Sequence, residues 1–462
     1  MHSVAIIGAG ISGLSAAYYL SKAGIACTLI EARPRLGGVV QTENIRNCVI
    51  EAGPDSFLSA KPWAMDLIRE LGLESEVIGS NDHQRKTYVW KRGRLVELPD
   101  GLQFLVPTRI WPMATSPLVS LPTKLRMALE YFRRPRAAAM RDRSVTDFVE
   151  EHYGREAVEY LAEPLLSGIY GGDPGQLSVS SVLPRFVELE TKYGSLTRGV
   201  LAERRTAASN GVRGLPLFRT LRGGLGRLIQ AMTDAAGAGT TVVYKPVESI
   251  ERTETGFRLR AGEDWLSATH VVLACEAHQA AQITTGLDSR ISSLLASVPY
   301  SSSMTVALGF DRGAVKNQMR GFGFLVPKRE RRRLLAATWV GNKFPHRVPD
   351  SLAVLRCFLG GTGDDGVLRE NDESILASVR EELSLIVGLT AEPLFWKVFR
   401  WPLSMAQYTV GHRERIAELE GRLEAIPGLY AAGNAYHGIG MPDCVRTGKL
   451  AAESIARKAG PC

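Results

Sequence analysis

The stretch Val4-Ala5-Ile6-Ile7-Gly8-Ala9-Gly10-Ile11-Ser12-Gly13 decides the fold of this chain. Its four leading apolar residues predict a short buried strand, and the glycines that follow predict a tight turn into a helix. Gly8 allows the turn, Gly10 lets backbone N–H groups approach a pyrophosphate, and Gly13 lets the helix pack closely on the strand. The stretch therefore predicts a dinucleotide-binding unit rather than a glycine-rich turn that binds no nucleotide.

A second apolar strand, predicted over residues 26–30, runs directly into Glu31 and Ala32. An acid at this distance accepts a hydrogen bond from a ribose hydroxyl, and its presence in place of an arginine argues against a 2′-phosphate. The segment Arg35-Leu36-Gly37-Gly38 then repeats the glycine pattern, with an arginine whose fork of donors matches phosphate oxygens. A second segment where backbone and arginine can approach phosphate suits a long cofactor. Enzymes that bind a nicotinamide cofactor do not need this second segment, so the sequence predicts FAD.

The composition is that of an ordinary globular protein of two or three domains, with 462 residues, 45% apolar and 23% charged. Lysine and arginine (56) exceed aspartate and glutamate (48), which favours anionic small molecules or an anionic membrane surface as partners over nucleic acid. The six cysteines are scattered without a C-x-x-C pair, so we expect neither a metal site nor disulfides. With no room for a signal peptide before the first strand, and no long apolar run, we expect a cytoplasmic protein.

The order of predicted elements indicates a mixed α/β (α+β) fold. A hairpin over residues 88–98 separates the first nucleotide-binding segment from a helical stretch, and short alternating strands before residue 271 lead back to a buried strand. We therefore expect a discontinuous Rossmann-like FAD-binding domain, a mixed-sheet substrate domain and a mainly helical domain. Their expected ranges are 1–85, 215–285 and 413–462 for FAD, 86–100 and 286–412 for substrate, and 101–214 for the helical domain.

The helical stretch contains an amphipathic segment over residues 124–132. Its apolar positions follow helical spacing, at Leu125, Ala128, Leu129 and Phe132. Between residues 124 and 143 basic side chains predominate: Lys124, Arg126, Arg133, Arg134, Arg136, Arg141 and Arg143 stand against Glu130 and Asp142. Two interpretations stay open: a helix lying on the inner face of the cell membrane, or the solvated outer face of a core helix.

Near the C-terminus, a predicted strand over residues 429–432 breaks at Gly433-Asn434. Pro442 and Asp443 then open a helix, as expected for a helix start. Backbone N–H groups of Ile439, Gly440 and Met441 point toward whatever precedes that helix. In a flavin enzyme this would be the N1–C2=O edge, where a positive helix end stabilises the reduced ring; otherwise the segment is a capped surface helix.

Over essentially its whole length the chain resembles the FAD-dependent protoporphyrinogen/coproporphyrinogen oxidase family, within the amine-oxidase-like flavoproteins. Motifs shared with many related flavoenzymes are the two glycine segments above, Glu51-Ala52-Gly53-Pro54 followed by Asp55, and Leu221-Arg222-Gly223-Gly224-Leu225. More specific motifs are Leu166-Ser167-Gly168-Ile169-Tyr170-Gly171-Gly172-Asp173-Pro174, Gly321-Phe322-Gly323-Phe324-Leu325-Val326-Pro327, Trp401-Pro402 with Gln407-Tyr408, and Gly433-Asn434-Ala435-Tyr436 with Gly438-Ile439-Gly440-Met441-Pro442-Asp443-Cys444.

The resemblance implies oxidation of a porphyrinogen, either protoporphyrinogen IX or coproporphyrinogen III, to the porphyrin in heme biosynthesis. Six electrons would leave in three steps, with dioxygen or a quinone-linked partner as acceptor. It implies that the Gly168 carbonyl meets pyrrole N–H groups, that Phe322, Leu325 and Phe358 form apolar walls, and that the Val247 backbone contacts adenine. No catalytic side chain is expected, because the flavin is the electron sink.

One position departs from the family pattern. The family carries a carboxylate-binding arginine after Leu-Pro-x-Gly-Leu, whereas here Leu98-Pro99-Asp100-Gly101-Leu102 is followed by Gln103. An amide can hydrogen-bond a carboxylate but lacks the charge, so Arg92, Arg94, Arg109 or water would have to assist Gln103. The sequence therefore leaves open which porphyrinogen is the substrate. It also leaves open whether the protein forms a homodimer.

Two other functions compete with this interpretation. FAD-dependent amine oxidases commonly place an aromatic residue before the Ala-Gly of the C-terminal strand, where this chain has Ala431. A non-redox protein that uses FAD as a scaffold is the other alternative.

Overall fold

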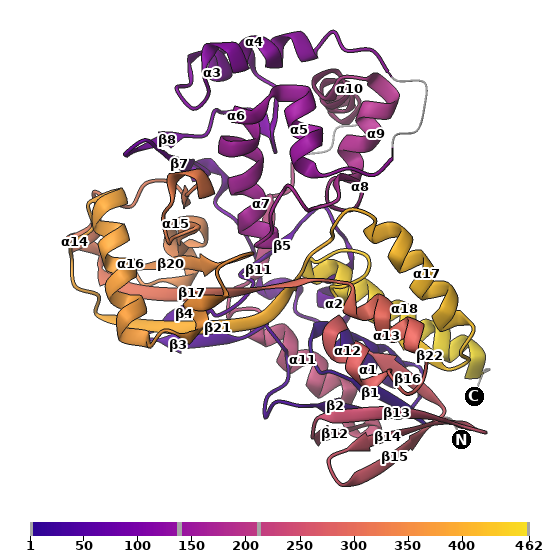
Figure 1. The fold of residues 1–462 in the computed structure, drawn as a ribbon. Helices are drawn as coiled ribbons and strands as arrows, with labels where there is room; N and C mark the ends of the chain where they lie inside the picture. Colours follow the sequence, from indigo (N-terminus) through magenta and orange to yellow (C-terminus); the bar gives the residue numbers. More distant parts are fainter. Residues whose placement is uncertain (1–2, 136–140, 210–213, 460–462) are drawn as a thin grey trace. The chain divides into compact units, whose positions relative to one another are not determined.

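The computed structural model describes residues 3–135, 141–209 and 214–459, which fall into two compact units (Figure 1). Unit 1 comprises Met1–Ser80, Pro216–Tyr300 and His412–Cys462, and unit 2 comprises Asn81–Leu215 and Ser301–Gly411. Arg136, counted among the basic residues above, lies outside the described residues. The mixed α/β class predicted from the sequence is confirmed.

Within the described residues, unit 1 is built on a five-stranded parallel sheet in the order β12-β2-β1-β16-β22. The strands are β1 (Val4–Ile7), β2 (Cys27–Glu31), β12 (Thr240–Tyr244), β16 (His270–Leu273) and β22 (Leu429–Ala431). β1 and β16 are buried along their whole length, which explains their uninterrupted apolar sequences. Because all the strands are parallel, their carboxyl ends meet at one edge of the sheet, where ligands bind in folds of this kind.

Helices α1 (Ile11–Lys22), α2 (Trp63–Glu70), α11 (Gly226–Ala236) and α18 (Met441–Ala459) share one hydrophobic core with this sheet. The first and last helices pack closely, because a Cβ on Gly448 of α18 would lie 2.2 Å from the Ser12 carbonyl oxygen. An antiparallel sheet of β13 (Val247–Thr253), β14 (Gly256–Ala261) and β15 (Asp264–Ala268) contacts β16 through β14.

Smaller elements complete unit 1. They are the hairpin β3 (Thr42–Ile45) and β4 (Cys48–Glu51), the small sheet of β5 (Phe57–Leu58), β11 (Phe218–Leu221) and β6 (Val77–Gly79), and helices α12 (Ala277–Ile283), α13 (Ser289–Ala296) and α17 (His412–Glu424). α13 packs against α12 and α17, so residues 286–300 belong here and not to the substrate segment in which the sequence analysis placed them.

Unit 2 contains a mixed sheet in the order β21-β17-β20-β19-β18-β7-β8. Its strands are β7 (Thr87–Lys91), β8 (Arg94–Glu97), β17 (Tyr300–Asp311), β18 (Gly323–Leu325), β19 (Ala336–Trp339), β20 (Leu352–Gly360) and β21 (Phe395–Ala406). Apolar side chains of one face form a core with α16 (Asp372–Val387). The predicted hairpin over residues 88–98 is confirmed as β7 and β8.

The helical segment belongs to unit 2 and does not form a unit of its own, because α7 packs against strand β18. It contains the short pair β9 (Leu102–Gln103) and β10 (Val106–Pro107), α3 (Ile110–Thr115), α4 (Leu121–Glu130), α5 (Val145–Tyr153), α6 (Arg155–Ala157), a π-helical turn (Val158–Ala162), α7 (Glu163–Tyr170), α8 (Val179–Val182), α9 (Pro184–Tyr193) and α10 (Leu196–Ser209).

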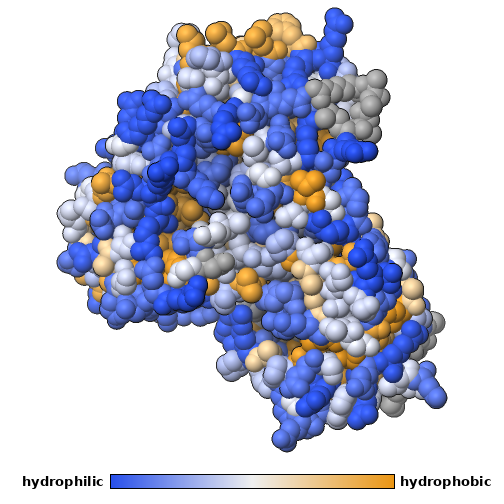
Figure 2. Space-filling model, in the orientation of Figure 1, coloured by the Kyte–Doolittle hydropathy of each residue, from blue (hydrophilic) through white to orange (hydrophobic). Residues whose placement is uncertain are grey.

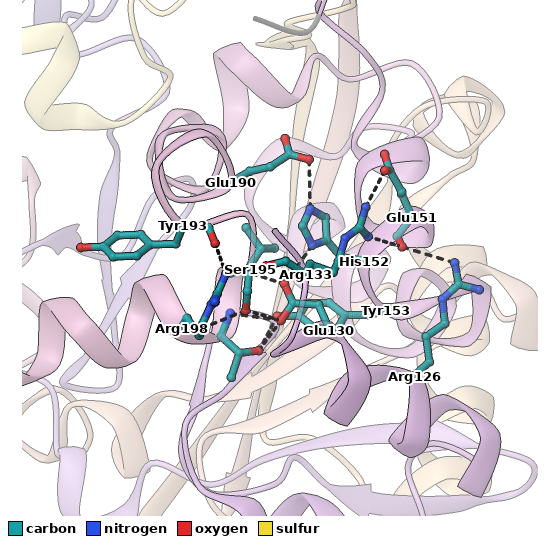
Figure 3. A network of polar contacts seen from close by, with 12 residues as sticks. Arg126, Glu130, Arg133, Glu151, His152, Tyr153, Glu190, Tyr193, Ser195 and Arg198 are labelled. Carbon is teal, nitrogen blue, oxygen red and sulfur yellow. Dashed lines mark hydrogen bonds and ion pairs between the residues drawn. The ribbon is translucent and has the colours of Figure 1, made fainter. Parts of the chain in front are cut away.

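A buried polar network joins four of these helices, and Figure 3 shows His152 between Glu130 and Glu190. His152 Nδ1 lies 3.0 Å from Glu130 Oε1, and its Nε2 lies 3.2 Å from Glu190 Oε1. Glu130 also accepts the Leu196 N–H and the Thr197 hydroxyl, so it caps the start of α10. Polar groups taken out of water are tolerated because each has a partner.

Helix α4 presents its apolar side to the outside. Thr123, Met127 and Glu130 are buried, whereas the apolar residues predicted from periodicity are exposed, Leu129 by 67% and Phe132 by 73%. Together with Ile110, Trp111, Leu121 and Leu125 they form an apolar surface over α3 and α4, at the top of the view in Figure 2. In the described part of the chain, no helix combines the length and the apolar character that crossing a bilayer requires.

Candidate functional site

The glycines of the first loop have the geometry expected of a dinucleotide-binding turn. Gly8 adopts φ +99°, and a Cβ on Gly13 would lie 1.9 Å from the Gly8 carbonyl oxygen, so only glycine allows this contact of helix with strand. A Cβ on Gly10 would meet nothing within 4 Å. The loop is thus tightly packed on its inner side and open at Gly10.

Two helix starts of unit 1 carry backbone N–H groups available to a ligand. Among the described residues, no acceptor takes the N–H groups of Ile11 and Ser12 at the start of α1, or those of Ile439, Gly440 and Met441 at the start of α18. Gly433 lies two residues beyond the end of β22, at the carboxyl edge of the sheet, with φ +144°. Free N–H groups and a helix dipole make such ends favourable for anionic or electron-rich groups.

Glu31 ends β2 beside this loop. Its Oε2 accepts the Ala9 N–H at 2.7 Å and its Oε1 accepts the Arg33 N–H at 2.9 Å. Each carboxylate oxygen keeps a further lone pair, so the acid can still accept a ribose hydroxyl.

The second glycine pair lies against the first. Gly37 donates its N–H to the Ala9 carbonyl and pairs with Gly10, and a Cβ on Gly38 would lie 3.1 Å from the Gly10 Cα. Arg35 turns toward this loop, where its guanidinium donates to the carbonyls of Leu36 and Val40, each at 3.1 Å. Burial, and secondarily the charge of Arg33, lowers the pKa of Arg35.

The remaining predicted cofactor residues of unit 1 have clear positions in the fold. Ala32 is exposed after β2, and Val247 begins β13 shortly after β12, whose last residue Tyr244 pairs with Glu31. Gly53, Pro54 and Asp55 follow β4, and a Cβ on Gly53 would lie 2.1 Å from the Val39 carbonyl oxygen. Asn434 accepts the Tyr300 hydroxyl at 3.3 Å.

Several structural roles were missed by the sequence analysis. Glu51, 1% exposed, accepts the Leu225 N–H at 2.7 Å and the Thr42 hydroxyl at 2.7 Å, and so links two motifs that are far apart in sequence. Asp443 is buried in an ion pair with Lys61 at 2.5 Å. The sequence holds only two signals of these roles. Glu51 stands directly before Ala-Gly-Pro, and Asp443 stands in the first turn of a helix.

In unit 2, Gly168 lies in the last turn of α7. A Cβ on Gly168 would come no nearer than 4.0 Å to Leu325, and no donor among the described residues reaches the Gly168 carbonyl. Neighbouring carbonyls are taken, that of Tyr170 by the Gln407 side chain at 2.7 Å and that of Gly171 by the Thr362 N–H at 2.8 Å. These hydrogen bonds fix the end of α7, and the Gly168 carbonyl remains available to a ligand.

Two of the three predicted apolar wall residues align across the sheet. Leu325 pairs with Ala336, which pairs with Phe358, and both Leu325 and Phe358 are half-buried. Phe322 lies one residue before β18 and is buried. The structure therefore places Gly168, Leu325 and Phe358 near one another, with Phe322 more enclosed.

The cation beside Gln103 is none of those suggested from the sequence. The Gln103 amide oxygen accepts two hydrogen bonds from Arg185, at 3.0 and 3.1 Å, in the amide orientation that satisfies its neighbours. Arg185 is also paired with Glu203, whereas Arg109 pairs with Asp100. No cluster of metal-ligating side chains is found in the described ranges.

Comparisons with known proteins find matches over nearly the whole chain. A family model described as flavin containing amine oxidoreductase matches residues 11–456. The coproporphyrinogen III oxidase of Bacillus subtilis (strain 168) is 35% identical over 97% of this chain and 96% of its own.

Solved structures add two further matches. A crystal structure from Exiguobacterium sp. 255-15, provisionally named a protoporphyrinogen oxidase, is 32% identical with a TM-score of 0.88 over 99% of both chains. Cyclohexylamine oxidase from Brevibacterium oxydans IH-35A covers 99% of both chains at a TM-score of 0.70, but at 20% identity it shows the fold alone.

Proposed function

This chain belongs to the flavin containing amine oxidoreductase family, and we propose that it oxidises coproporphyrinogen III to the porphyrin, with dioxygen as the electron acceptor. The observation that carries this choice of substrate is the match over nearly the whole chain to a relative of that name, at 35% identity. The protein is an oxidoreductase and its cofactor is FAD, which accepts a hydride from the substrate when bound.

Unit 1 has the residues that FAD requires. We assign the pyrophosphate to Gly10 and the N–H groups of Ile11 and Ser12, because this is the open part of a loop that is otherwise tightly packed. Glu31 would bind the ribose, and the Val247 backbone lies at the same sheet edge for the adenine. The free N–H groups of Ile439, Gly440 and Met441 would stabilise charge that collects on the reduced ring.

Unit 2 supplies a surface suited to a large apolar macrocycle with N–H groups at its centre. The Gly168 carbonyl is an acceptor without a partner among the described residues. A Cβ on Gly168 would lie 4.0 Å from Leu325, which aligns across the sheet with Phe358, and both are half-buried apolar side chains. A ligand site of this kind is mostly apolar with a few convergent polar groups.

Gln103 and Arg185 form a pair suited to a substrate carboxylate. Arg185 Nη1 and Nη2 donate to the neutral Gln103 oxygen, which a carboxylate would replace with a stronger, charge-assisted contact, while Nε and Nη2 also donate to Glu203. Coproporphyrinogen carries more propionate groups than protoporphyrinogen, so this pair favours the former. If the protein oxidised both porphyrinogens with equal efficiency, Gln103 and Arg185 would not determine the choice of substrate.

We expect the purified yellow protein, mixed in air with coproporphyrinogen III, to generate porphyrin fluorescence and hydrogen peroxide. The same assay with protoporphyrinogen IX should give a lower kcat/KM, and amines should not reduce the flavin. Flavin reduction by amines, with no porphyrin formed from either porphyrinogen, would contradict the proposal.

Gly168→Leu should lower kcat/KM for the porphyrinogen by about 100-fold, because the larger side chain displaces the macrocycle from its reacting position. Gly168→Ala is the matched control, since a Cβ at this position would lie 4.0 Å from the Leu325 side chain, which leaves room for one methyl group. The flavin spectrum should be unchanged in both. Unchanged turnover in Gly168→Leu would remove Gly168 from the substrate site.

The apolar surface over α3 and α4 is suited to peripheral contact with an anionic bilayer. Its exposed side chains include Trp111, Leu129 and Phe132. At its rim, Lys124 donates to the Ala114 carbonyl and Arg126 to the Glu150 carbonyl, so neither charge is neutralised by these bonds. Cations beside a large exposed apolar patch favour an anionic lipid surface.

Leu129→Ser combined with Phe132→Ser should weaken binding to vesicles of phosphatidylcholine and phosphatidylglycerol by about 1,000-fold, since each apolar side chain contributes about 2 kcal/mol when buried. Vesicle flotation measures this, and activity in solution should not change. The control is Leu385→Ser, an exposed leucine on α16. If the double variant floated with the vesicles as well as the wild type does, the apolar surface over α3 and α4 would bind a partner other than the membrane.

A further inference from the structure

Oxidation of a porphyrinogen releases protons as well as electrons. In a step that oxidises one bridge, one methylene C–H bond and one pyrrole N–H bond break, and a double bond forms between ring and bridge. The three steps together remove four C–H and two N–H hydrogens, so one of the three protons comes from the last methylene bridge. The hydride carries both electrons to the flavin, so the N–H proton must be taken by another group. The sequence predicts no side chain for this task.

Glu163 and Ser167 lie on α7, the helix that carries Gly168, and Ser167 is the residue before Gly168 in the chain. The Ser167 hydroxyl donates to Glu163 Oε1 at 2.8 Å, and the Lys328 N–H donates to Glu163 Oε2 at 3.0 Å. Further along α7, where this helix packs against β18, a Cβ on Gly168 would lie 4.0 Å from the Leu325 side chain. Ser167 precedes in the chain the residue whose carbonyl is assigned to the pyrrole N–H groups, and its hydroxyl donates its hydrogen to a carboxylate.

The charges around Glu163 leave it able to bind a proton. No ion pair to Glu163 is found among the described residues. The charge of Lys328 lowers the pKa of the Glu163 carboxyl, and the charge of Asp173 raises it. The other polar groups near this contact are engaged, Arg329 with Glu159 and Glu330 with Tyr160. Burial raises the pKa of the Glu163 carboxyl above its ordinary value, despite the bonds from Lys328 and Ser167. Carboxyls with raised pKa values in a substrate site are candidates for proton transfer.

We propose that Glu163 is the proton acceptor of the reaction and that Ser167 relays the proton to it from the pyrrole nitrogen. The proposal rests on the function proposed above. Ser167 accepts the pyrrole proton on its oxygen while its own hydrogen passes to Glu163. The carboxylic acid then loses this proton to water before the next step. The bound flavin would supply the electron acceptor, and dioxygen would become hydrogen peroxide by taking up two electrons and two protons.

The test follows flavin bleaching after anaerobic mixing with coproporphyrinogen, across a range of pH. The wild-type rate should fall as the pH drops through a pKa above the ordinary glutamate value, because only the carboxylate accepts a proton. Glu163→Gln should be about 100-fold slower and lose this acidic limb. Ser167→Ala should be similarly slow, and Ser167→Thr, which restores the hydroxyl, should recover most of the rate.

Two further measurements separate catalysis from structure. The Kd for the product porphyrin, measured by fluorescence, and the unfolding temperature should be unchanged in Glu163→Gln. Glu159→Gln is the matched control, a glutamate one turn earlier whose partners are Arg155 and Arg329. A Glu163→Gln protein that keeps the acidic limb, or that loses porphyrin binding in proportion to rate, would show that Glu163 only holds the helix. A wild-type flavin that no porphyrinogen bleaches would overturn the proposed function itself.

Discussion

Gly10→Ala is expected to yield a folded protein that purifies without its yellow cofactor. Gly10 has φ −68° and ψ −179°, a conformation that alanine adopts, and a Cβ there meets no protein atom within 4 Å. The methyl group would instead occupy the space through which the pyrophosphate reaches the N–H groups of Ile11 and Ser12. Losing charge-assisted hydrogen bonds of this kind costs about 1.5–3 kcal/mol each, so with two N–H groups affected the affinity for FAD should fall by at least about 100-fold.

Two other glycines make this experiment specific. Gly421→Ala, in helix α17 with open space around it, should leave flavin content unchanged and raise stability slightly, because alanine is the better helix former. Gly13→Ala should instead destabilise the fold, because its Cβ would overlap the Gly8 carbonyl. Flavin content is read from the ratio of flavin to protein absorbance, and stability from thermal unfolding. A Gly10→Ala protein with full flavin content would place the pyrophosphate elsewhere.

Local patterns were sufficient to predict most of unit 1. Strand, turn and helix in Val4–Ile7 and Ile11–Lys22 are determined by residues within a few positions of one another. The same holds for β22 and α18, whose break at Gly433 and start near Pro442 have clear local signals. Elements of this kind can be predicted because their contacts are short in sequence.

What could not be predicted depends on contacts between distant segments. Helical spacing identified the apolar side of α4, but periodicity does not say whether that side is buried, and Leu125 and Leu129 are exposed. Arg185 meets Gln103 from a helix far along the chain, so no local motif announces the pair. Glu163 was overlooked because its setting is created by Lys328, on a loop after β18.

Glu130→Ala is expected to destabilise the helical segment by about 3–5 kcal/mol, because it removes one partner from a buried charged network. Glu130 is fully buried between His152 and the start of α10 (Figure 3). Without its carboxylate, His152 Nδ1 and the Leu196 N–H would be left unpaired away from water. Chemical denaturation with two probes measures the change, and Glu188→Ala, an exposed glutamate on α9, is the control with an expected change within about 0.5 kcal/mol.

Acid should weaken the same network in a defined range of pH. Burial alone would raise the pKa of Glu190, but hydrogen bonds from His152 and Arg143 outweigh it and lower the pKa to about 2. A glutamate in the unfolded chain titrates near about 4.3. The stabilisation is therefore complete above that value and is lost as the pH falls toward the folded-state pKa. Glu190→Gln should flatten the fall in unfolding temperature between about pH 4.5 and 2; an unaltered slope would mean that other carboxylates cause the acid sensitivity.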